Sequence, residues 1–274
     1  SDERFFLIAG PCVAESLELC LEIGETVGEL TEKFGISFIF KASYSKANRL
    51  SGSSYSGPGL DEGLRILQIV KERLSVPILT DVHETSEVGS AADVADIIQI
   101  PAFLCRQTEL IRRAAATGKW VNIKKGQFLA PEDMAPLIDK AGADGANDGA
   151  NKRVMVTERG TTFGYHNLVV DFRSLMIMRK FGVPVVFDAT HSLQLPGADG
   201  HSSGGRPEFT QAFCRAALAI GVDGLFIETH PNPSEAKSDS KSMIPLAQLE
   251  RLLEDCVRVS EALAPSGKPQ ETLS

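Results

Sequence analysis

Four side chains of metal-binding type follow strand-like segments near the two ends of the chain. In chain order they are Cys12, His191, Glu228 and Asp239. One thiolate, one imidazole and two carboxylates form a ligand set that suits Zn, Fe(II), Mn or Co better than Mg or Ca. Taken singly, Cys12 could be a buried apolar thiol, and His191 could hydrogen-bond to a loop carbonyl. Together, at strand ends that a closed barrel makes neighbours, they predict a site for one divalent metal ion.

Five basic side chains also follow strand-like segments and could bind anions. They are Lys41, Lys46, Arg49, Lys124 and Arg159. Guanidinium groups make forked contacts with phosphate, whereas the Lys ammonium is a compact point charge. Each could instead pair with a neighbouring carboxylate. Because the chain has 36 acidic and 28 basic residues, with a net charge of -8, five cations on one face favour anions from outside. More than one phosphate or carboxylate group is therefore expected to bind.

The elements that must position these side chains alternate along the chain. Nearly continuous apolar segments, typical of strands covered on both faces, lie at Phe5–Ala9, Ser37–Lys41, Val76–Asp81, Asp96–Pro101, Trp120–Lys124, Val154–Arg159, Val183–Asp188 and Gly224–Glu228. Segments of helical period separate them, beginning after Ser16 as N-cap and continuing at Asp61–Leu74, Glu84–Val94, Thr108–Ala116, Pro131–Lys140, Leu168–Phe181, Glu208–Ile220 and Leu246–Leu263.

Eight strands alternating with eight helices predict one (β/α)8 TIM barrel over residues 1–274, an α/β fold; an open doubly wound sheet is the alternative. The active site is expected at the C-terminal ends of the strands. The loops Ser45–Gly59 and Leu195–Pro207 would hang over that face, and the second, rich in Gly, predicts a mobile lid. Gly142–Lys152 falls on the opposite face, and its spacing does not fit a calcium loop.

The composition indicates a globular protein and excludes several classes of partner. Hydrophobic residues make up 43% and charged residues 23% of the chain. The acidic balance gives no surface for nucleic acid or an anionic membrane, and no apolar run reaches the roughly 20 residues that span a bilayer. The start of the chain lacks the pattern of a secretion signal, and the 5 Cys are scattered. We therefore expect a cytoplasmic protein.

Several runs of residues at the predicted strand ends carry a family resemblance. They include Ala-Gly-Pro-Cys at 9–12, Phe-Lys-Ala-Ser at 40–43, Lys-Ala-Asn-Arg at 46–49, Thr-Asp-Val-His-Glu at 80–84, Asn-Ile-Lys-Lys at 122–125, Phe-Asp-Ala-Thr-His at 187–191 and Phe-Ile-Glu-Thr-His-Pro at 226–231. The chain resembles the 3-deoxy-D-manno-octulosonate 8-phosphate synthase family along essentially its whole length. The resemblance implies condensation of phosphoenolpyruvate with D-arabinose 5-phosphate and water, giving the eight-carbon sugar acid phosphate and inorganic phosphate for lipopolysaccharide biosynthesis.

The same resemblance implies roles residue by residue. Phosphoenolpyruvate would be bound by Lys41, Ser43, Gln99, Ala102, Lys124 and Arg159. Arabinose 5-phosphate would be bound by Lys46, Asn48 and Arg49, with Arg106 reaching in from a neighbouring subunit of a homotetramer. A branch of the family with Asn in place of Cys12 works without metal, so this chain resembles the metal-dependent branch. Lys46 is then a candidate proton donor to the developing alkoxide, and Asp81 a candidate to orient water.

The sequence departs from the family pattern at two positions, and three alternative functions are considered. Leu50 stands where family members commonly have Ser, and Ser45 where many have Asp. Both differences change the contacts expected with the sugar phosphate. The nearest alternative is the related 3-deoxy-arabino-heptulosonate 7-phosphate synthase, which uses erythrose 4-phosphate and generally has Lys-Pro-Arg-Thr where this chain has Lys-Ala-Asn-Arg. A non-catalytic barrel that binds sugar phosphates would have lost some ligands. A metal-dependent hydrolase usually has more His in its site.

Overall fold

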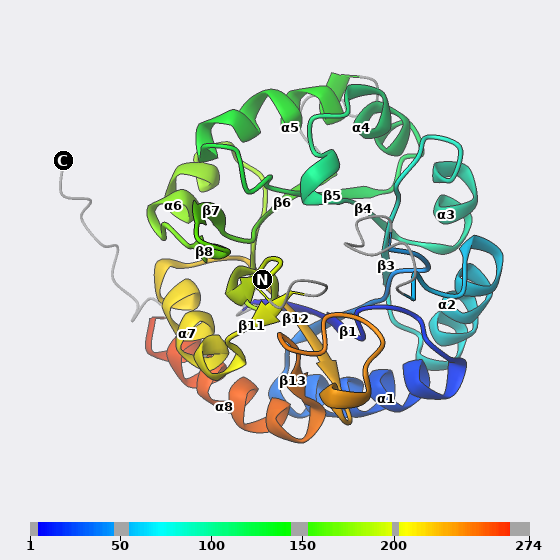
Figure 1. Ribbon diagram of the computed structural model, residues 1–274, viewed down its shortest axis with the longest axis vertical. Coiled ribbons are helices and arrows are strands. Elements are labelled where there is room, and N and C mark those ends of the chain that lie inside the picture. The colour runs from blue at the N-terminus through cyan, green and yellow to red at the C-terminus, as the bar shows by residue number, and fades with distance from the viewer. Residues whose placement is uncertain (1–4, 47–54, 144–152, 199–202, 264–274) are drawn as a thin grey trace.

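The computed structural model describes residues 5–46, 55–143, 153–198 and 203–263 of the 274-residue chain. Parallel strands form a closed ring with helices around it (Figure 1), so the predicted (β/α)8 barrel is confirmed. The eight strands of the ring are β1 (Phe6–Gly10), β2 (Ser37–Lys41), β3 (Ile78–Asp81), β4 (Ile97–Ile100), β5 (Trp120–Lys124), β6 (Val154–Glu158), β9 (Val185–Asp188) and β12 (Gly224–His230). The first strand closes the ring, because β1 pairs with β12 on one side and β2 on the other.

The strands are buried on both sides, which explains their nearly continuous apolar sequences. One small cluster fills the ring and consists of Ile8, Leu79, Ile97, Met155, Val186 and Phe226. A much larger cluster lies between the strands and the surrounding helices. Since the interior of the ring is packed with side chains, a ligand is expected at the strand ends rather than inside the barrel.

The outer layer consists of α1 (Leu17–Phe34), α2 (Leu60–Leu74), α3 (Val88–Val94), α4 (Thr108–Ala115), α5 (Met134–Ala143), α6 (Arg173–Arg179), α7 (Thr210–Ile220) and α8 (Leu246–Leu263). Ser16 caps α1 as expected, because its Oγ accepts the N–H of Leu19 at 3.2 Å. The helix ends at Gly35 with a left-handed φ of 64°. None of the described helices combines the length and apolar character of a membrane span.

Two predicted helices begin a full turn or more after the residue that the sequence pattern indicates. The helix predicted over Leu168–Phe181 is wrong in its first part, because β8 (Asn167–Val169) pairs there with β7 (Thr161–Gly164) as a hairpin. The turn of the hairpin contains Tyr165 and His166, both at positive φ. Because the hairpin extends to Val169, helix α6 starts only at Arg173. The helix predicted from Glu84 begins at Val88. The carboxylate of Glu87 accepts the preceding N–H groups of His83 and Glu84, which holds this segment in a turn.

Loops at the C-terminal ends of the barrel strands contain three further short strands. β10 (Gln194–Leu195) and β11 (Gly204–Gly205) pair antiparallel near the ends of the predicted lid, and β13 (Ile244–Pro245) pairs with β12. Several predicted features lie wholly or partly outside the described residues: Asn48, Arg49, Leu50, the middle of the loop Ser45–Gly59, the centre of the lid at 199–202 and most of the insertion Gly142–Lys152. The lid's mobility and the single domain over 1–274 therefore stay predictions.

Candidate active site

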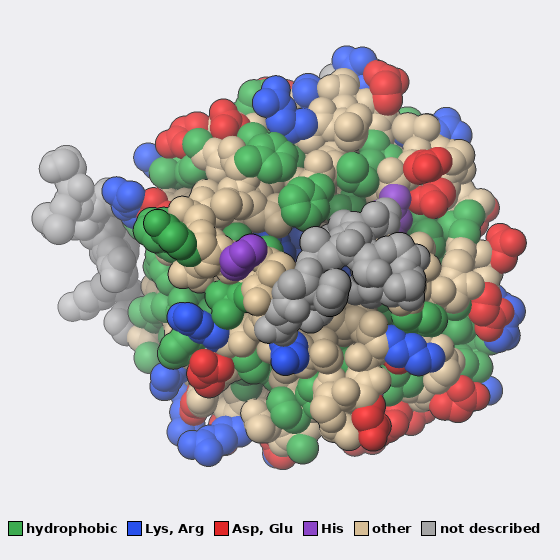
Figure 2. Space-filling view, viewed as in Figure 1, with side chains coloured by type: hydrophobic (Ala, Val, Ile, Leu, Met, Phe, Trp, Pro, Cys, Tyr) green, Lys and Arg blue, Asp and Glu red, His purple; other side chains and the backbone are tan. Residues whose placement is uncertain are grey.

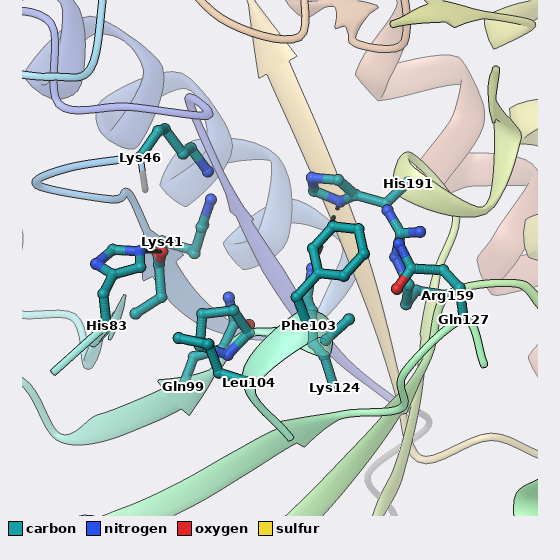
Figure 3. Close-up of a pocket in the computed structure, with 13 residues that line it drawn as sticks. Lys41, Lys46, His83, Gln99, Phe103, Leu104, Lys124, Gln127, Arg159 and His191 are labelled. Carbon is teal, nitrogen blue, oxygen red and sulfur yellow. Dashed lines mark hydrogen bonds and ion pairs between the residues drawn. The ribbon is translucent and has the colours of Figure 1, made fainter. Parts of the chain in front are cut away.

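A pocket of about 260 Å³ opens at the C-terminal ends of the barrel strands, and it contains most of the predicted substrate ligands. Its lining consists of Lys41, Lys46, Asp81, His83, Gln99, Pro101, Ala102, Phe103, Leu104, Lys124, Gln127, Arg159 and His191. In Figure 2 a basic side chain shows at the bottom of a hollow near the middle of this face. Figure 3 shows how Lys41, Lys124 and Arg159 approach a common space from three separate strands.

Two of the predicted anion-binding cations already have partners within the protein. Lys41 Nζ donates to Glu228 Oε1 at 2.7 Å, and Lys124 Nζ donates to Asp188 Oδ2 at 2.5 Å. All four side chains are buried. Lys41 and Lys124 therefore form salt bridges in this structure, and their binding of an anion stays a prediction. The physical reason is that the barrel brings acidic and basic strand ends together, and buried charges require counter-charges.

Arg159 is different, because its partner in the described part of the chain is neutral. Its Nη2 donates to Gln194 Oε1 at 3.0 Å, while the buried Nη1 has no hydrogen-bonding partner among the described residues. Burial lowers the pKa of Arg159, yet a guanidinium starts so high that it stays charged at neutral pH. A buried cation with a free donor at the edge of a pocket is suited to an anionic ligand.

The four predicted metal ligands lie together at the meeting point of β1, β9 and β12. One ligand atom each of Cys12, Glu228 and Asp239 lies within 4.8 Å of the others, so these residues form a candidate metal site. His191 Nε2 is 3.6 Å from Glu228 Oε2 and 3.7 Å from Asp239 Oδ2. Cys12 Sγ donates to Asp239 Oδ2 at 3.0 Å and contacts the hydroxyl of Ser238 at the same distance.

The surroundings of these side chains fit a metal ion. His191 Nδ1 lies 2.8 Å from Asp188 Oδ2, a contact that orients the ring and leaves Nε2 facing the two carboxylates. Glu228 Oε2 is buried and has no hydrogen-bonding partner among the described residues. An orphaned carboxylate oxygen beside a thiol, an imidazole and a second carboxylate is what a transition-metal site requires.

The protonation states also fit. Burial, followed by the charges of Asp239 and Glu228, raises the pKa of Cys12 well above its ordinary value. The thiol is therefore protonated when no metal ion is bound. Burial raises the pKa of Asp239, but the neighbouring ring of His191 and the charge of Lys46 outweigh this and lower it. The cluster therefore presents ionised carboxylates and one thiol whose proton a cation would displace.

Lys46, Asp81 and His83 form a second polar group across the pocket. Burial lowers the pKa of Lys46, but the negative charges of Asp81, Glu228 and Asp239 outweigh this and raise it overall, so the ammonium is charged. Burial raises the pKa of Asp81, but Lys46 and His83 outweigh it and hold the pKa well below the usual range. Asp81 Oδ2 lies 3.0 Å from His83 Nε2, and its Oδ1 accepts the hydroxyl of Ser43.

Of the remaining predicted substrate ligands among the described residues, two line the pocket and one does not. Gln99 lines the pocket and accepts Asn122 Nδ2 at 3.0 Å, and Ala102 lines it from the turn after β4. Arg106 is exposed and is not part of this lining.

Sequence reasoning missed six residues of the site: Pro101, Phe103, Leu104, Gln127, Gln194 and Ser238. They lie in short turns, loops and the two-residue strand β10, which are too short for a strand or helix period to show which side chain turns inward. Proximity to the predicted ligands Ala102, Lys124 and Asp239 was the one signal available for Phe103, Gln127 and Ser238.

Fold and site together define a (β/α)8-barrel protein with a pocket lined by several basic side chains beside a candidate metal centre. A sequence model of the DAHP synthetase I family matches residues 1–264, and the chain belongs to this family. It is 56% identical over 253 residues to 2-dehydro-3-deoxyphosphooctonate aldolase of Xanthomonas campestris pv. campestris (strain B100), which covers 92% of this chain and 90% of the relative. It is 57% identical over 264 residues to the protein of the same name from Burkholderia mallei (strain SAVP1), covering 96% and 93% respectively.

Proposed function

We propose that this protein condenses phosphoenolpyruvate with D-arabinose 5-phosphate and water, giving 3-deoxy-D-manno-octulosonate 8-phosphate and inorganic phosphate. The observation that carries the proposal is Arg159, a buried cation whose Nη1 is unpartnered among the described residues, next to Lys124 and beside the Cys12 cluster. The name shared by relatives that are 56–57% identical favours the octulosonate product over the heptulosonate of the alternative.

The phosphoenolpyruvate end of the reaction would lie over β2, β5 and β6. We assign its phosphate to Arg159 and Lys124 and its carboxylate to Lys41, with Ser43, Gln99 and Ala102 shaping the pocket. Fixed cations there would hold the reacting C3 toward the aldehyde and stabilise phosphate as it leaves.

The sugar phosphate would enter from the β2–α2 loop, which carries Lys46 together with Asn48 and Arg49. The charged ammonium of Lys46 could hydrogen-bond to the aldehyde oxygen and give it a proton as C3 attacks. The ionised carboxylate of Asp81 could accept a hydrogen bond from the water that adds to C2.

One divalent ion, Zn, Fe, Mn or Co, is proposed to bind Cys12, His191, Glu228 and Asp239. When bound, such an ion would supply positive charge that orients and polarises oxygen ligands in the pocket. Glu228 would connect this centre to the substrate pocket, because its Oε1 accepts from Lys41 while Oε2 faces His191.

We further propose a homotetramer in which Arg106 of one subunit reaches the sugar phosphate of another. An exposed Arg106 supports this arrangement, because it lies next to the lining residue Leu104 without lining the pocket of its own chain. A cytoplasmic location fits the free state of all five cysteines, each buried.

The deciding experiment measures phosphate release from phosphoenolpyruvate with arabinose 5-phosphate or erythrose 4-phosphate, each with and without chelator. We expect turnover with arabinose 5-phosphate, strongly reduced by the chelator and restored by added metal. Preference for erythrose 4-phosphate would establish the heptulosonate alternative. Binding of both sugars without phosphate release would instead establish a non-catalytic sugar-phosphate barrel.

A further inference from the structure

A buried ion pair lies directly behind the side chains proposed to bind phosphoenolpyruvate. Lys124 and Arg159 line the catalytic pocket, whereas their chain neighbours Lys125 and Glu158 point away from it. Lys125 also lines a separate pocket of about 530 Å³ on the other side of the β5–α5 turn. The side chains of Lys125 and Glu158 are each 1% exposed, and Lys125 Nζ lies 3.6 Å from Glu158 Oε2.

Hydrogen bonds extend this pair into a unit that crosses four segments of the chain. Lys125 Nζ donates to the carbonyl of Leu129 at 3.2 Å and to Thr161 Oγ1 at 3.0 Å. The carboxylate of Glu158 accepts the hydroxyl of Ser174, on α6, and the N–H of Gly160, the latter at 2.7 Å. The β5–α5 turn, the end of β6, the start of β7 and helix α6 are thereby joined at one buried point.

The contacts of this unit enclose the backbone of Arg159. Glu158 precedes Arg159 and bonds across it to the N–H of Gly160, whose φ is 88°. A Cβ at Gly160 would lie 3.3 Å from Leu168 Cβ and 3.5 Å from Ser192 Cα, so this turn has little room to shift. On the other strand, Lys125 follows Lys124 and its N–H donates to the carbonyl of Thr157 at 2.8 Å. The backbones that carry Lys124 and Arg159 are therefore tied to each other through their outer neighbours.

Stability alone does not explain such a pair, because apolar residues of similar volume usually replace a buried ion pair at little or no loss of stability. We propose that Lys125, Glu158 and Ser174 are positioning residues that fix the separation of Lys124 and Arg159, so that both cations meet one phosphoenolpyruvate molecule. This inference rests on the proposed function. It places no new group in contact with substrate, since the three side chains act through the two cations on their other side.

The test compares single and double replacements of the ion pair. Lys125→Met and Glu158→Gln alone each leave a buried group without its partner and should lower the urea midpoint. The double variant K125M/E158Q removes both charges and should recover most of that midpoint. We expect the double variant still to bind phosphoenolpyruvate at least about tenfold more weakly by calorimetry, because small misplacements of fixed groups are costly. The KM for arabinose 5-phosphate should stay within about twofold of wild type, since its proposed ligands lie on other loops.

Each outcome decides the inference. Recovery of phosphoenolpyruvate affinity together with stability in the double variant would show a purely structural pair, and an equal rise of both substrate constants would show general loosening; either result overturns the proposal. If the double variant does not fold, Ser174→Ala gives the answer. That variant removes one hydrogen bond and should raise the phosphoenolpyruvate Kd while leaving the KM for the sugar unchanged; an unchanged Kd contradicts the inference.

A neighbouring surface residue provides the matched control. Arg173 precedes Ser174 on α6 and makes an exposed ion pair with Asp171, so Arg173→Met should change neither substrate constant. Calorimetry with phosphoenolpyruvate alone separates this inference from the proposed function. If wild-type protein releases no phosphate with arabinose 5-phosphate, the proposed function fails, while the binding titrations still show whether the unit positions the two cations.

Discussion

At the scale of single residues, two of the three cations proposed to bind phosphoenolpyruvate are paired with carboxylates of the protein. Lys41 pairs with one oxygen of Glu228, and Lys124 pairs with Asp188. Among the described residues, two buried atoms of charged side chains have no hydrogen-bonding partner: Glu228 Oε2 and Arg159 Nη1. One of these orphans faces the candidate metal ligands and the other lies at the anion pocket. The carboxylate oxygen of Glu228 would therefore be satisfied by a cation, and the guanidinium nitrogen of Arg159 by an anion.

Cys12 gives the sharpest test of the metal centre. Cys12→Ala removes the soft ligand, so we expect metal content to fall from about one ion per chain to near zero after dialysis, with turnover reduced by about 100-fold or more. Elemental analysis and phosphate release measure the two effects. Cys20→Ala is the matched control, because Cys20 is equally buried but lies on α1. Full turnover of the Cys12 variant in metal-free buffer would refute the assigned role.

His83 predicts a pH dependence of stability. Burial lowers its pKa, but the hydrogen bond and charge of Asp81 outweigh this and raise the pKa above 6.5. A raised pKa means that the folded protein binds the proton more tightly, so this stabilisation is complete below pH 6.5 and disappears as pH rises through the folded pKa. We expect His83→Gln to lower the free energy of unfolding by about 1 kcal/mol more at pH 6 than at pH 9.

Urea titrations of both proteins at the two pH values measure this difference. His166→Gln serves as the control, because His166 lies in an exposed turn and bonds to the carbonyl of Pro196 rather than to a carboxylate. An equal loss of stability for His83→Gln at both pH values would show that the proton on His83 contributes nothing.

At the scale of elements, the loop that carries Asp239 is held by two neighbouring loops. Glu15, after β1, accepts the N–H of Lys237 at 2.8 Å. The ammonium of Lys237 lies 4.7 Å from the centre of the Tyr55 ring, on the β2–α2 loop. Asp239 itself has a positive φ of 49°, a conformation that a non-Gly residue keeps only when its surroundings hold it. The position of this carboxylate therefore depends on contacts outside the candidate metal site.

Glu15→Ala should accordingly weaken metal binding although Glu15 is not a ligand. We expect about a tenfold loss of metal affinity, the size of effect seen when groups supporting a ligand are removed. Competition with a chromogenic chelator measures it. Glu15→Gln keeps an oxygen that can accept the N–H of Lys237 and should retain most of the affinity, while Glu18→Ala, one turn along on exposed α1 surface, should change nothing. Equal affinities in all three variants would show that the loop needs no such support.

The elements also show what sequence could and could not predict. All eight barrel strands were predictable, because buried parallel strands such as Val154–Glu158 are continuous apolar runs ending in a polar side chain. The strand ends in turn placed Cys12, Lys41 and Arg159 on one face. The β7–β8 hairpin was missed, because its strands have no run of buried side chains and its turn depends on local backbone conformation. The internal pairing of Lys41 with Glu228 depends on barrel closure and leaves no mark in the sequence.

At the scale of the whole molecule, the catalytic face presents more apolar surface than a solitary barrel needs. Phe103, after β4, is 57% exposed; Phe128, Phe163 and Tyr165 are 55%, 71% and 98% exposed. Phe103 lines the catalytic pocket, while Phe128 and Phe163 line the neighbouring one. Large exposed aromatic side chains of this kind are typical of surfaces that contact another protein. Phe103 lies on the β4–α4 loop together with the exposed Arg106, which favours the proposed assembly.

Mixing two inactive variants tests whether Arg106 completes a neighbour's pocket. Arg106→Ala should leave each subunit with an intact cation pocket but without the arginine that a neighbour requires, whereas Lys41→Ala should destroy its own pocket and still supply Arg106. In co-expressed, randomly mixed oligomers, about one site in four then combines both native residues, so activity should rise from near zero to roughly a quarter of wild type. Phosphate release on the co-purified mixture measures the gain, and light scattering reports the oligomer. If Arg106 served its own pocket, mixing would restore nothing, since no subunit would hold both residues.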